Sequence, residues 1–339
     1  MIQQAIEKAL ARENLTREEA RQVMNAIFSG ETTPAQIAGF LIALRAKGET
    51  SDEIAGCAEA MRDHVVHVTP QRQDLVDTAG TGGDGQKTIN ISTGAALLAA
   101  AAGAGVAKHG NRAASSATGS ADVLEALGFT LELPPERIAR SIDELGFGFM
   151  FAQAHHPAMR HAGAVRRELG TRTIFNILGP LTNPARARCQ VIGVYSVDLV
   201  RPIAEALVQL GSHRAFVVHG AGGLDELSPV GPNTVCEVRD GKVVDHLIDP
   251  IDLGVPRCSV EELRGGDPAE NAAAIRDVFR GGNGARRNAI LLNAAGAVAA
   301  AGLAEDLQEG LELARGALAS RLADQRLDEL VAFSQEVPA

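Results

Sequence analysis

A glycine-rich stretch, DTAGTGGDGQKTINIST at residues 77–93, carries residue types that hold phosphate groups. Its glycines allow backbone N–H groups to approach an anion closely, and Thr88, Ser92 and Thr93 place hydroxyls at or near the start of an expected helix. Asp84 lies inside the loop, where an acid beside phosphate is best tolerated if it contacts hydroxyls, water or a divalent cation. The stretch is therefore a candidate phosphate-binding loop.

The loop departs from both common nucleotide-binding patterns. Its glycines satisfy G-x-G-x-x-G, but a dinucleotide site needs an acid about 20 residues further on, and none occurs in residues 85–121. A P-loop needs lysine directly after its last glycine, whereas here Gln86 precedes Lys87. The structural alternative is a tight strand-to-helix turn that binds nothing, and the rest of the chain has to decide.

A second loop, KHGNRAASSATGS at residues 108–120, contains the same kinds of group. Its cations and hydroxyl donors are Lys108, Arg112, Ser115, Ser116 and Ser120. We expect each loop to follow a strand of a parallel sheet, and such loops meet outside the carboxyl ends of the strands. The acid-free span fits a shared anionic ligand, because a carboxylate there would repel it.

A pair of carboxylates follows a further expected strand. The motif GLDELS comes directly after AFVVHG, so Asp225 and Glu226 fall on a loop at the strand's carboxyl end. Adjacent carboxylates, completed by a hydroxyl or by phosphate oxygens, suit Mg²⁺, which keeps most of its water and bridges phosphates. The alternative is that the two acids merely open a solvated helix.

The stretch HHPAMRHAGAVRRELGTRTIFNILGPLTNP, residues 155–184, combines basic, amide and proline side chains, namely His156, Arg166, Arg167, Arg172, Asn176 and Pro180. An arginine suits a carboxylate held by two hydrogen bonds, although on a helix it is more often solvated. The histidines here and in HVVH, residues 64–67, lack cysteine or carboxylate ligands at regular spacing, which argues against a transition-metal cluster. The residues alone thus indicate a phosphate-rich ligand, magnesium and a second substrate with a carboxylate.

Two kinds of element position these loops. The first 65 residues are typical of helices, with capping-box spacing at Thr16, Thr33 and Thr50 and apolar residues at helical spacing between them. From Leu75 onward, short β-rich runs such as LVDTA, VAKHG and AFVVHG alternate with helices. We expect an α/β fold class, in which a small N-terminal all-helical domain precedes a larger α/β domain with a central, largely parallel sheet flanked by helices.

Two local features refine this expectation. CEVRDGKVVDHLI interrupts the alternation with a hairpin, since Asp240-Gly241 is typical of a type I′ turn. SADVLEALG is expected to form a helix with Ser120 as its N-cap.

The composition limits the classes of partner. The 339 residues carry a net charge of −10, with one Tyr, ten Phe and no Trp, which argues against binding to nucleic acid or to an anionic membrane. No apolar stretch reaches the length of about 20 residues that a membrane span needs, and the N-terminus lacks the apolar core of a signal peptide. The four cysteines are widely separated and fit buried thiols in a reducing compartment. We therefore expect a cytoplasmic protein with small-molecule substrates.

Taken in order, the motifs GTGGDG, NIST, KHGNRAASS, GSADVLEALG, HHPAMR, VRRELGTRTIFNILGPLTNP and DELS resemble those of the anthranilate phosphoribosyltransferase family. The resemblance implies a helical domain, residues 1–70, completed by segments within about 160–185, and an α/β domain, residues 71–339, with the active site in the cleft between them. It also implies a homodimer formed through the helical domain. The implied reaction belongs to L-tryptophan biosynthesis: with Mg²⁺ present, the amine of anthranilate displaces pyrophosphate from phosphoribosyl pyrophosphate, which gives N-(5-phosphoribosyl)anthranilate.

The resemblance further implies the residues of the site. Those for phosphoribosyl pyrophosphate are Gly80, Gly83, Asp84, Thr88, Asn90, Ile91, Ser92, Thr93, Lys108, His109, Gly110, Asn111, Arg112, Ala113, Ala114, Ser115, Ser116 and Ser120. Those for anthranilate are Gly80, Asn111, His156, Arg166 and Pro180, and those for Mg²⁺ are Ser92, Asp225 and Glu226. We expect three catalytic residues: Lys108 stabilises the charge on pyrophosphate, Arg166 holds the anthranilate carboxylate, and His109 is the candidate general base.

Two other functions fit parts of the pattern. A pyrimidine nucleoside phosphorylase would share the architecture and a related glycine loop, but we expect it to lack KHGNR and NIST. A non-catalytic relative that binds nucleic acid would show a basic surface and a degraded magnesium pair, whereas this chain is acidic and keeps Asp225 and Glu226.

Overall fold

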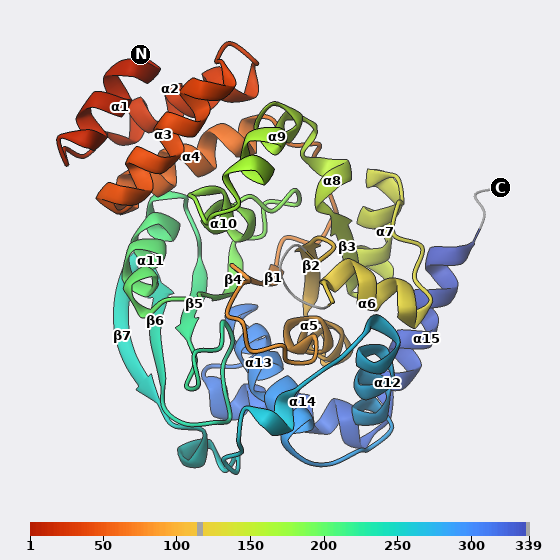
Figure 1. Ribbon diagram of the computed structural model, residues 1–339. Helices are drawn as coiled ribbons and strands as arrows, with labels where there is room; N and C mark the ends of the chain where they lie inside the picture. The colour runs from red at the N-terminus through yellow and green to blue at the C-terminus, as the bar shows by residue number, and fades with distance from the viewer. Residues whose placement is uncertain (114–117, 337–339) are drawn as a thin grey trace.

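A bundle of four N-terminal helices lies at one corner of the protein, beside a larger α/β body (Figure 1). The computed structural model describes residues 1–113 and 118–336. The helices of the bundle are α1 Ile2–Leu10, α2 Arg17–Phe28, α3 Pro34–Lys47 and α4 Ser51–Asp63. Thr16, Thr33 and Thr50 each cap the next helix in a complete capping box, so these three predicted starts are confirmed.

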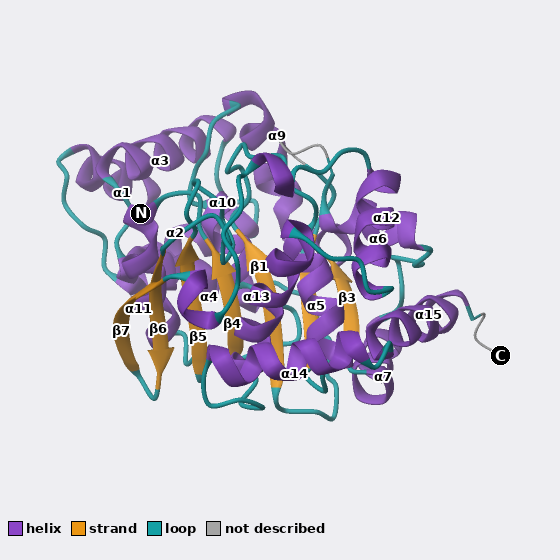
Figure 2. Cartoon of the chain, turned by 90° about the horizontal axis from the view of Figure 1, so that it is seen from below, coloured by secondary structure: helices purple, strands orange, loops and turns teal. Residues whose placement is uncertain are grey.

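The described residues of the α/β body form a seven-stranded sheet in the order β3-β2-β1-β4-β5-β6-β7, whose strands Figure 2 shows side by side. The strands are β1 Leu75–Gly80, β2 Gly105–Gly110, β3 Phe147–Phe151, β4 Cys189–Gly193, β5 Arg214–His219, β6 Asn233–Arg239 and β7 Lys242–Ile248. Strands β1 to β5 run parallel, while β6 and β7 are antiparallel. The predicted fold class is thus confirmed, and Asp240 and Gly241 join β6 to β7 with φ of +53° and +73°, as a type I′ turn requires.

Helices cover both faces of the sheet. One group contains α5 Ile91–Ala101, α6 Ser120–Leu127, α12 Pro268–Phe279, α13 Ala285–Ala300, α14 Leu307–Ala319 and α15 Leu322–Gln335. The others are α7 Pro135–Leu145, α8 Ala152–His155, α9 Arg160–Leu169, α10 Phe175–Leu178 and α11 Val200–Gln209. Val191 and Phe216 share a core with α5 and α13, whereas the adjacent residues Ile192 and Val217 share a core with α11. This alternation is the period of two that a strand covered on both faces must show.

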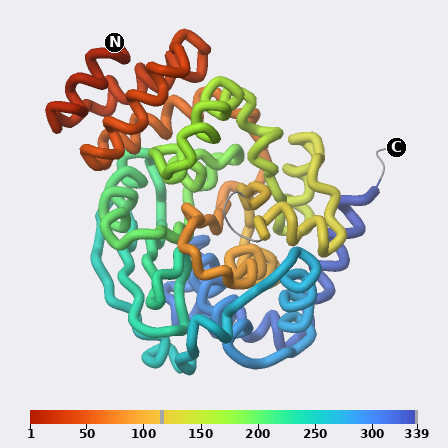
Figure 3. The backbone as a smooth tube through the Cα atoms, viewed as in Figure 1, coloured from red at the N-terminus to blue at the C-terminus, as the bar shows by residue number. Residues whose placement is uncertain are grey.

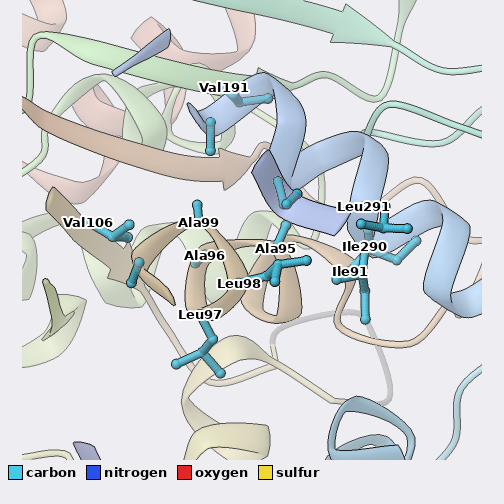
Figure 4. Close-up of a cluster of buried hydrophobic side chains, with 14 of the residues drawn as sticks. Ile91, Ala95, Ala96, Leu97, Leu98, Ala99, Val106, Val191, Ile290 and Leu291 are labelled. Atoms are coloured by element: carbon cyan, nitrogen blue, oxygen red, sulfur yellow. The ribbon is translucent and has the colours of Figure 1, made fainter. Parts of the chain in front are cut away.

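The packing of α5 fixes the start of that helix beneath the glycine loop. Figure 4 shows its alanines close to Val106 of β2 and Val191 of β4, with Ile290 and Leu291 of α13 nearby. A Cβ on Gly94 would lie only 2.8 Å from Ile290 Cδ1, so the small residues of α5 allow α13 to approach closely. The N-terminus of α5 is therefore held by a buried core.

The chain returns to the helical bundle after β3, as the tube in Figure 3 shows. Helix α9 packs against α2 and α3, and α10 packs against α4. Val165 and Phe175 share a hydrophobic core with Phe40 and Leu44 of α3. We propose that these segments complete the helical domain and that its boundary lies near residue 70.

The structure corrects and extends several expectations about single elements. The N-cap of α6 is Gly119 rather than Ser120, and Gly119 N donates to Asp122 Oδ2 at 2.9 Å. Strands β3 and β4 were not anticipated from the sequence. The four cysteines are free thiols, and no described helix has the length and apolar character of a membrane span.

Candidate active site

The three predicted loops meet at the carboxyl ends of the parallel strands. The glycine loop leaves β1, the KHGNR loop leaves β2 beside it, and the DELS loop follows β5. Asn90 Nδ2 donates to Thr118 O at 3.0 Å, which joins the first loop to the end of the second. The structure thus brings together three segments that are up to 143 residues apart in the chain, because a parallel sheet collects its strand ends at one edge.

The backbone of the glycine loop adopts positive φ at several residues, a conformation that residues with side chains rarely take. Gly82, Gly83 and Gly85 have φ of +67°, +77° and +77°, and Lys87 has φ of +54°. Its first residue is tied to β4, since Thr81 N donates to Gly193 O at 2.9 Å. These conformations explain the glycine spacing without reference to a nucleotide fingerprint.

The predicted acidic pair follows β5 and reaches across β4 to meet this loop. Asp225 Oδ2 accepts from Gly82 N at 2.7 Å, and Glu226 Oε1 accepts from Ser92 N at 3.2 Å. A Cβ on Gly80 would lie 2.4 Å from Asp225 Oδ2, and one on Gly193 would lie 1.4 Å from Asp225 O. Glycines at the ends of β1 and β4 therefore make room for the pair. No helix begins at these acids in the described structure, so the solvated-helix alternative is wrong.

The electrostatics of the acidic pair favour a cation. Burial and the nearby Asp84 carboxylate raise the pKa of Asp225 to about 7, and burial together with Asp225 raises that of Glu226 well above its usual value. Glu226 Oε2 is buried and has no hydrogen-bond partner among the described residues. No group of three or more His, Cys, Asp or Glu side chains in the described ranges forms a metal site by itself. The donor set suits Mg²⁺, because this ion commonly binds one or two carboxylates and takes its other oxygens from phosphates and water.

Lys108 lies beneath the loop rather than at its surface. Its side chain is buried, and Nζ donates to Thr78 O at 2.6 Å. Burial lowers the pKa of Lys108 to about 8, and the charges of Asp77 and Glu226 oppose that shift. The ammonium group therefore lies within the electrostatic reach of the acidic pair.

A buried carboxylate, that of Asp77, holds the strand and loop residues next to Lys108. Asp77 accepts from His109 N at 3.2 Å and from Asn183 Nδ2 at 2.7 Å, and burial raises its pKa to about 6. Sequence reasoning gave Asp77 no role. The sequence did carry a signal for it, namely an acid inside the expected strand LVDTA, because a buried charge needs a partner.

The candidate base is one member of a buried histidine pair. His109 Nδ1 lies 3.1 Å from Gly179 O, and its Nε2 lies 3.1 Å from Nε2 of His156. Burial lowers the pKa of His109 to about 4 and that of His156 to about 3, so both rings are neutral at pH 7. A carbonyl can only accept, so His109 carries its hydrogen on Nδ1, and its Nε2 accepts from His156. The lone pair of His109 is thus already engaged.

Arg166 is available for an anionic group. It lies half-buried on α9, with its guanidinium 5.1 Å from the centre of the Phe175 ring, and burial lowers its pKa. No acidic side chain pairs with it in the described part of the chain. Pro180, on the same returning segment, is buried, and its carbonyl accepts from Gln190 Nε2 at 2.7 Å.

Other predicted residues are oriented differently. Arg112 is exposed and pairs with Asp122 at 3.0 Å and Glu125 at 2.8 Å, while Asn111 Oδ1 accepts from Arg112 N. Ala113 N also donates to Asp122, and Ser120 Oγ donates to Asn111 O at 3.3 Å. The KHGNR loop thus pairs mainly with α6.

The remaining predicted residues divide by location. Thr88 bridges to Arg264, Ile91 is buried at the start of α5, and the buried hydroxyl of Thr93 has no partner within residues 1–113 or 118–336. A Cβ on Gly110 would lie 2.2 Å from Ser120 Oγ. Ala114, Ser115 and Ser116 lie outside the described residues.

The fold and the site define a glycosyl transferase. The helical bundle domain of the glycosyl transferase family matches residues 3–65, and its a/b domain matches residues 72–323. The anthranilate phosphoribosyltransferase of Anaeromyxobacter sp. (strain K) is 53% identical over 339 residues, which are 100% of both chains. That of Thermoanaerobacter sp. (strain X514) is 49% identical over 337 residues, covering 99% of this chain and 100% of that protein. The chain therefore belongs to the anthranilate phosphoribosyltransferase family, whose activity serves tryptophan biosynthesis.

Solved structures agree with this assignment. The crystal structure of anthranilate phosphoribosyltransferase from Thermus thermophilus superposes with a TM-score of 0.93 at 50% identity, covering 98% of this chain and 99% of that chain. The Saccharomyces cerevisiae enzyme in complex with phosphoribosyl pyrophosphate and Mg gives a TM-score of 0.89 at 27% identity, covering 99% and 98%. The same yeast enzyme has also been solved with 4-fluoroanthranilate.

Proposed function

We propose that this chain joins the phosphoribosyl group of 5-phosphoribosyl 1-pyrophosphate to the amine of anthranilate. The amine nitrogen forms a bond to C1 of the ribose, the bond from C1 to the pyrophosphate oxygen breaks, and the nitrogen loses one proton. The observation that carries the proposal is the acidic pair, because Asp225 and Glu226 hydrogen-bond to the backbone at both ends of the glycine loop. Such a site positions a phosphorylated substrate and stabilises the charge that builds on its leaving group.

Magnesium is the cofactor that fits these residues. Ser92, Asp225 and Glu226 would hold it, and the buried, unpartnered Glu226 Oε2 supplies a free ligand atom. When bound, Mg²⁺ contributes positive charge beside the pyrophosphate. The yeast relative was solved with phosphoribosyl pyrophosphate and Mg together, which supports the assignment.

The glycine loop and the KHGNR loop would bind phosphoribosyl pyrophosphate. Its proposed ligands are the residues of these loops that the family motifs imply, from Gly80 to Thr93 and from Lys108 to Ser120. Lys108 acts from beneath the loop, where its ammonium group offsets the charge of Glu226. Arg112 becomes a phosphate ligand only if it leaves Asp122 and Glu125.

Anthranilate would occupy the space between these loops and the returning segment. We propose that Arg166 binds its carboxylate, with Gly80, Asn111, His156 and Pro180 around the ring. The aromatic amine is neutral at pH 7 and already nucleophilic, so the reaction does not require a strong base. The engaged lone pair and the low pKa of His109 support a role in shaping this pocket rather than in removing a proton.

A homodimer through the helical domain completes the proposal. Leu10 at the end of α1 and Ile42 on α3 are exposed apolar residues, with 65% and 39% of their surface accessible. A second copy would cover them. The free cysteines fit a reducing compartment, and we place the enzyme in the cytoplasm.

One assay tests the function against its alternatives. Purified protein is mixed with anthranilate, phosphoribosyl pyrophosphate and Mg²⁺, and the fluorescence of anthranilate is followed. We expect a decrease that requires all three components. Constant fluorescence together with phosphate-dependent cleavage of thymidine would establish a nucleoside phosphorylase instead, and nucleic-acid binding without either reaction would establish a non-catalytic relative.

A further inference from the structure

Arg172 connects the glycine loop to two other parts of the molecule. It follows α9, and its guanidinium donates through Nη2 to the carbonyl of Gly83. The same guanidinium stacks on Tyr195, 4.0 Å from the centre of the ring. Tyr195 lies two residues beyond the end of β4, so Arg172 joins the loop to the carboxyl end of this central strand.

The helical bundle holds Arg172 in turn. Arg45 lies exposed on α3, and its Nη1 donates to the backbone oxygen of Arg172 and, at 2.7 Å, to Thr171 Oγ1. Hydrogen bonds therefore run from the bundle through residues 171–172 to Gly83. This connection links the helical domain to the loop that we propose for phosphoribosyl pyrophosphate.

The loop needs such a restraint because of its composition. Thr81 is fixed by Tyr195 N, which donates to its Oγ1 at 3.1 Å, and Gly82 is fixed by Asp225. Gly83 comes next with φ of +77°, and its side chain is only a hydrogen atom, so it cannot anchor itself. A Cβ at Gly83 would lie 3.0 Å from Arg172 Nη2, which shows how closely the two residues approach. Glycine loses more conformational freedom on ordering than any other residue, so an external hydrogen bond matters most there.

Among the described residues, no carboxylate competes with Gly83 for the guanidinium of Arg172. No acidic side chain forms an ion pair with it in the described part of the chain. Glu49 of the bundle is the acid whose charge reaches Tyr195, where it adds to burial in raising the pKa of the phenol. Burial raises the pKa of Glu49 itself, and the positive charges of Lys47 and Arg45 oppose that shift. A guanidinium without a carboxylate partner next to Gly83 also adds positive potential beside an anionic ligand.

We propose that Arg172 is a positioning residue for phosphoribosyl pyrophosphate, which it serves by fixing Gly83, and that Arg45 of the helical domain acts on the same loop through it. The inference rests on the proposed function of this loop. It requires no contact between Arg172 and the substrate. It also assigns an effect on substrate binding to Arg45, a surface residue of a different domain.

The test uses Arg172→Ala, Arg172→Lys, Arg45→Ala and the double variant of both alanine changes. Arg167→Ala is the matched control, because Arg167 is an exposed arginine of α9. The KM for phosphoribosyl pyrophosphate and kcat come from anthranilate fluorescence. The Kd for phosphoribosyl pyrophosphate with Mg²⁺ comes from calorimetry without anthranilate, and hydrogen exchange reports on residues 81–88.

We expect Arg172→Ala to raise the KM and the Kd roughly tenfold, with kcat changed less than threefold, because ordering one or two further residues costs about that factor. Arg172→Lys should recover part of the loss, since it keeps a donor. Arg45→Ala should raise the Kd about threefold and add nothing in the double variant, because both residues act through one connection. Both alanine variants should exchange amide hydrogens faster at residues 81–88, and Arg167→Ala should match the parent.

Unchanged Kd values in Arg172→Ala would overturn the inference, and so would strictly additive effects of the two alanine variants. If Arg172→Ala does not fold, Tyr195→Leu provides the same readout, because it removes the surface on which the guanidinium stacks. A parent protein that binds phosphoribosyl pyrophosphate but does not consume anthranilate would refute the proposed function alone. The calorimetric comparison of the variants would then still decide the role of Arg172.

Discussion

Gly80→Ala is the most direct test of how the acidic pair is held. A Cβ at this position would lie 2.4 Å from Asp225 Oδ2 and 3.0 Å from its Cγ. An ordinary contact between these atoms is about 3.4 Å, so the carboxylate must move by roughly 1 Å. Asp225 Oδ2 lies 2.7 Å from Gly82 N, and the same shift would stretch that contact beyond hydrogen-bonding distance.

The expected loss of activity follows from the hydrogen bond between Gly82 N and Asp225 that the substitution breaks. A hydrogen bond to a charged group contributes about 1.5–3 kcal/mol, and each 1.4 kcal/mol is a factor of ten in a rate or a binding constant. We therefore expect kcat/KM for phosphoribosyl pyrophosphate to fall roughly 10- to 150-fold. The Mg²⁺ concentration at half-maximal rate should rise as well, because Asp225 is one of the proposed ligands.

The assay is anthranilate fluorescence at a series of Mg²⁺ concentrations, with thermal unfolding as a check on the fold. Gly316→Ala is the matched control: Gly316 lies on α14, and a Cβ there would meet nothing within 4 Å. That control should keep full activity and gain about 0.5–1 kcal/mol of stability, because alanine is the better helix former. A folded Gly80→Ala protein with a kcat/KM and a Mg²⁺ curve within twofold of the parent would refute the reasoning.

Three further predictions address single roles. Arg166→Ala should raise the KM for anthranilate roughly 10- to 100-fold and leave that for phosphoribosyl pyrophosphate nearly unchanged; a change in the second constant alone would contradict the carboxylate assignment. Asp225→Asn combined with Glu226→Gln should abolish the Mg²⁺ dependence of the rate, and an unchanged Mg²⁺ titration would exclude the pair as ligands. The third concerns His156, whose folded pKa of about 3 lies below the unfolded value of about 6.5. Its contribution to stability is therefore present above pH 6.5 and is lost as the pH falls, by about 2 kcal/mol at pH 5. His156→Gln should remove that part of the acid sensitivity in urea unfolding at pH 5 and pH 7.5, and identical pH dependence in both proteins would contradict a buried neutral ring.

Features set by neighbouring residues could be predicted from the sequence. The capping boxes at Thr16, Thr33 and Thr50 depend on residues three positions apart, and the type I′ turn depends on one dipeptide. The position of Asp225 after a strand was equally local. The prediction that Ser120 is the N-cap of α6 was wrong, because the helix begins one residue earlier in the chain than expected. Gly119 is the N-cap, and its backbone N–H donates to Asp122, three residues further on.

Contacts between distant segments could not be predicted in the same way. The hydrogen bond from Arg172 to Gly83 depends on α9 returning to the bundle, and nothing in the motif ELGTRT specifies a partner. The pairing of His109 with His156 depends on β2 and β3 lying side by side. Histidines in both segments were visible in the sequence, but their mutual burial, which keeps them neutral, was not.

The short strand β4 explains why the order of the strands at the site could not be predicted from the loops alone. CQVIG is only five residues long and follows a segment without regular structure, so no periodic pattern distinguishes it. Yet the order of the sheet reverses between β1 and β4, because β2 and β3 continue on one side and β5 continues on the other. Ligands of open parallel sheets bind at such a reversal, where the loops on the two sides diverge. Gly80 and Gly193 pair in register across it, and Asp225 lies over both. The acidic pair can therefore reach across β4 to the glycine loop only because β1 and β4 both end in a residue without a side chain.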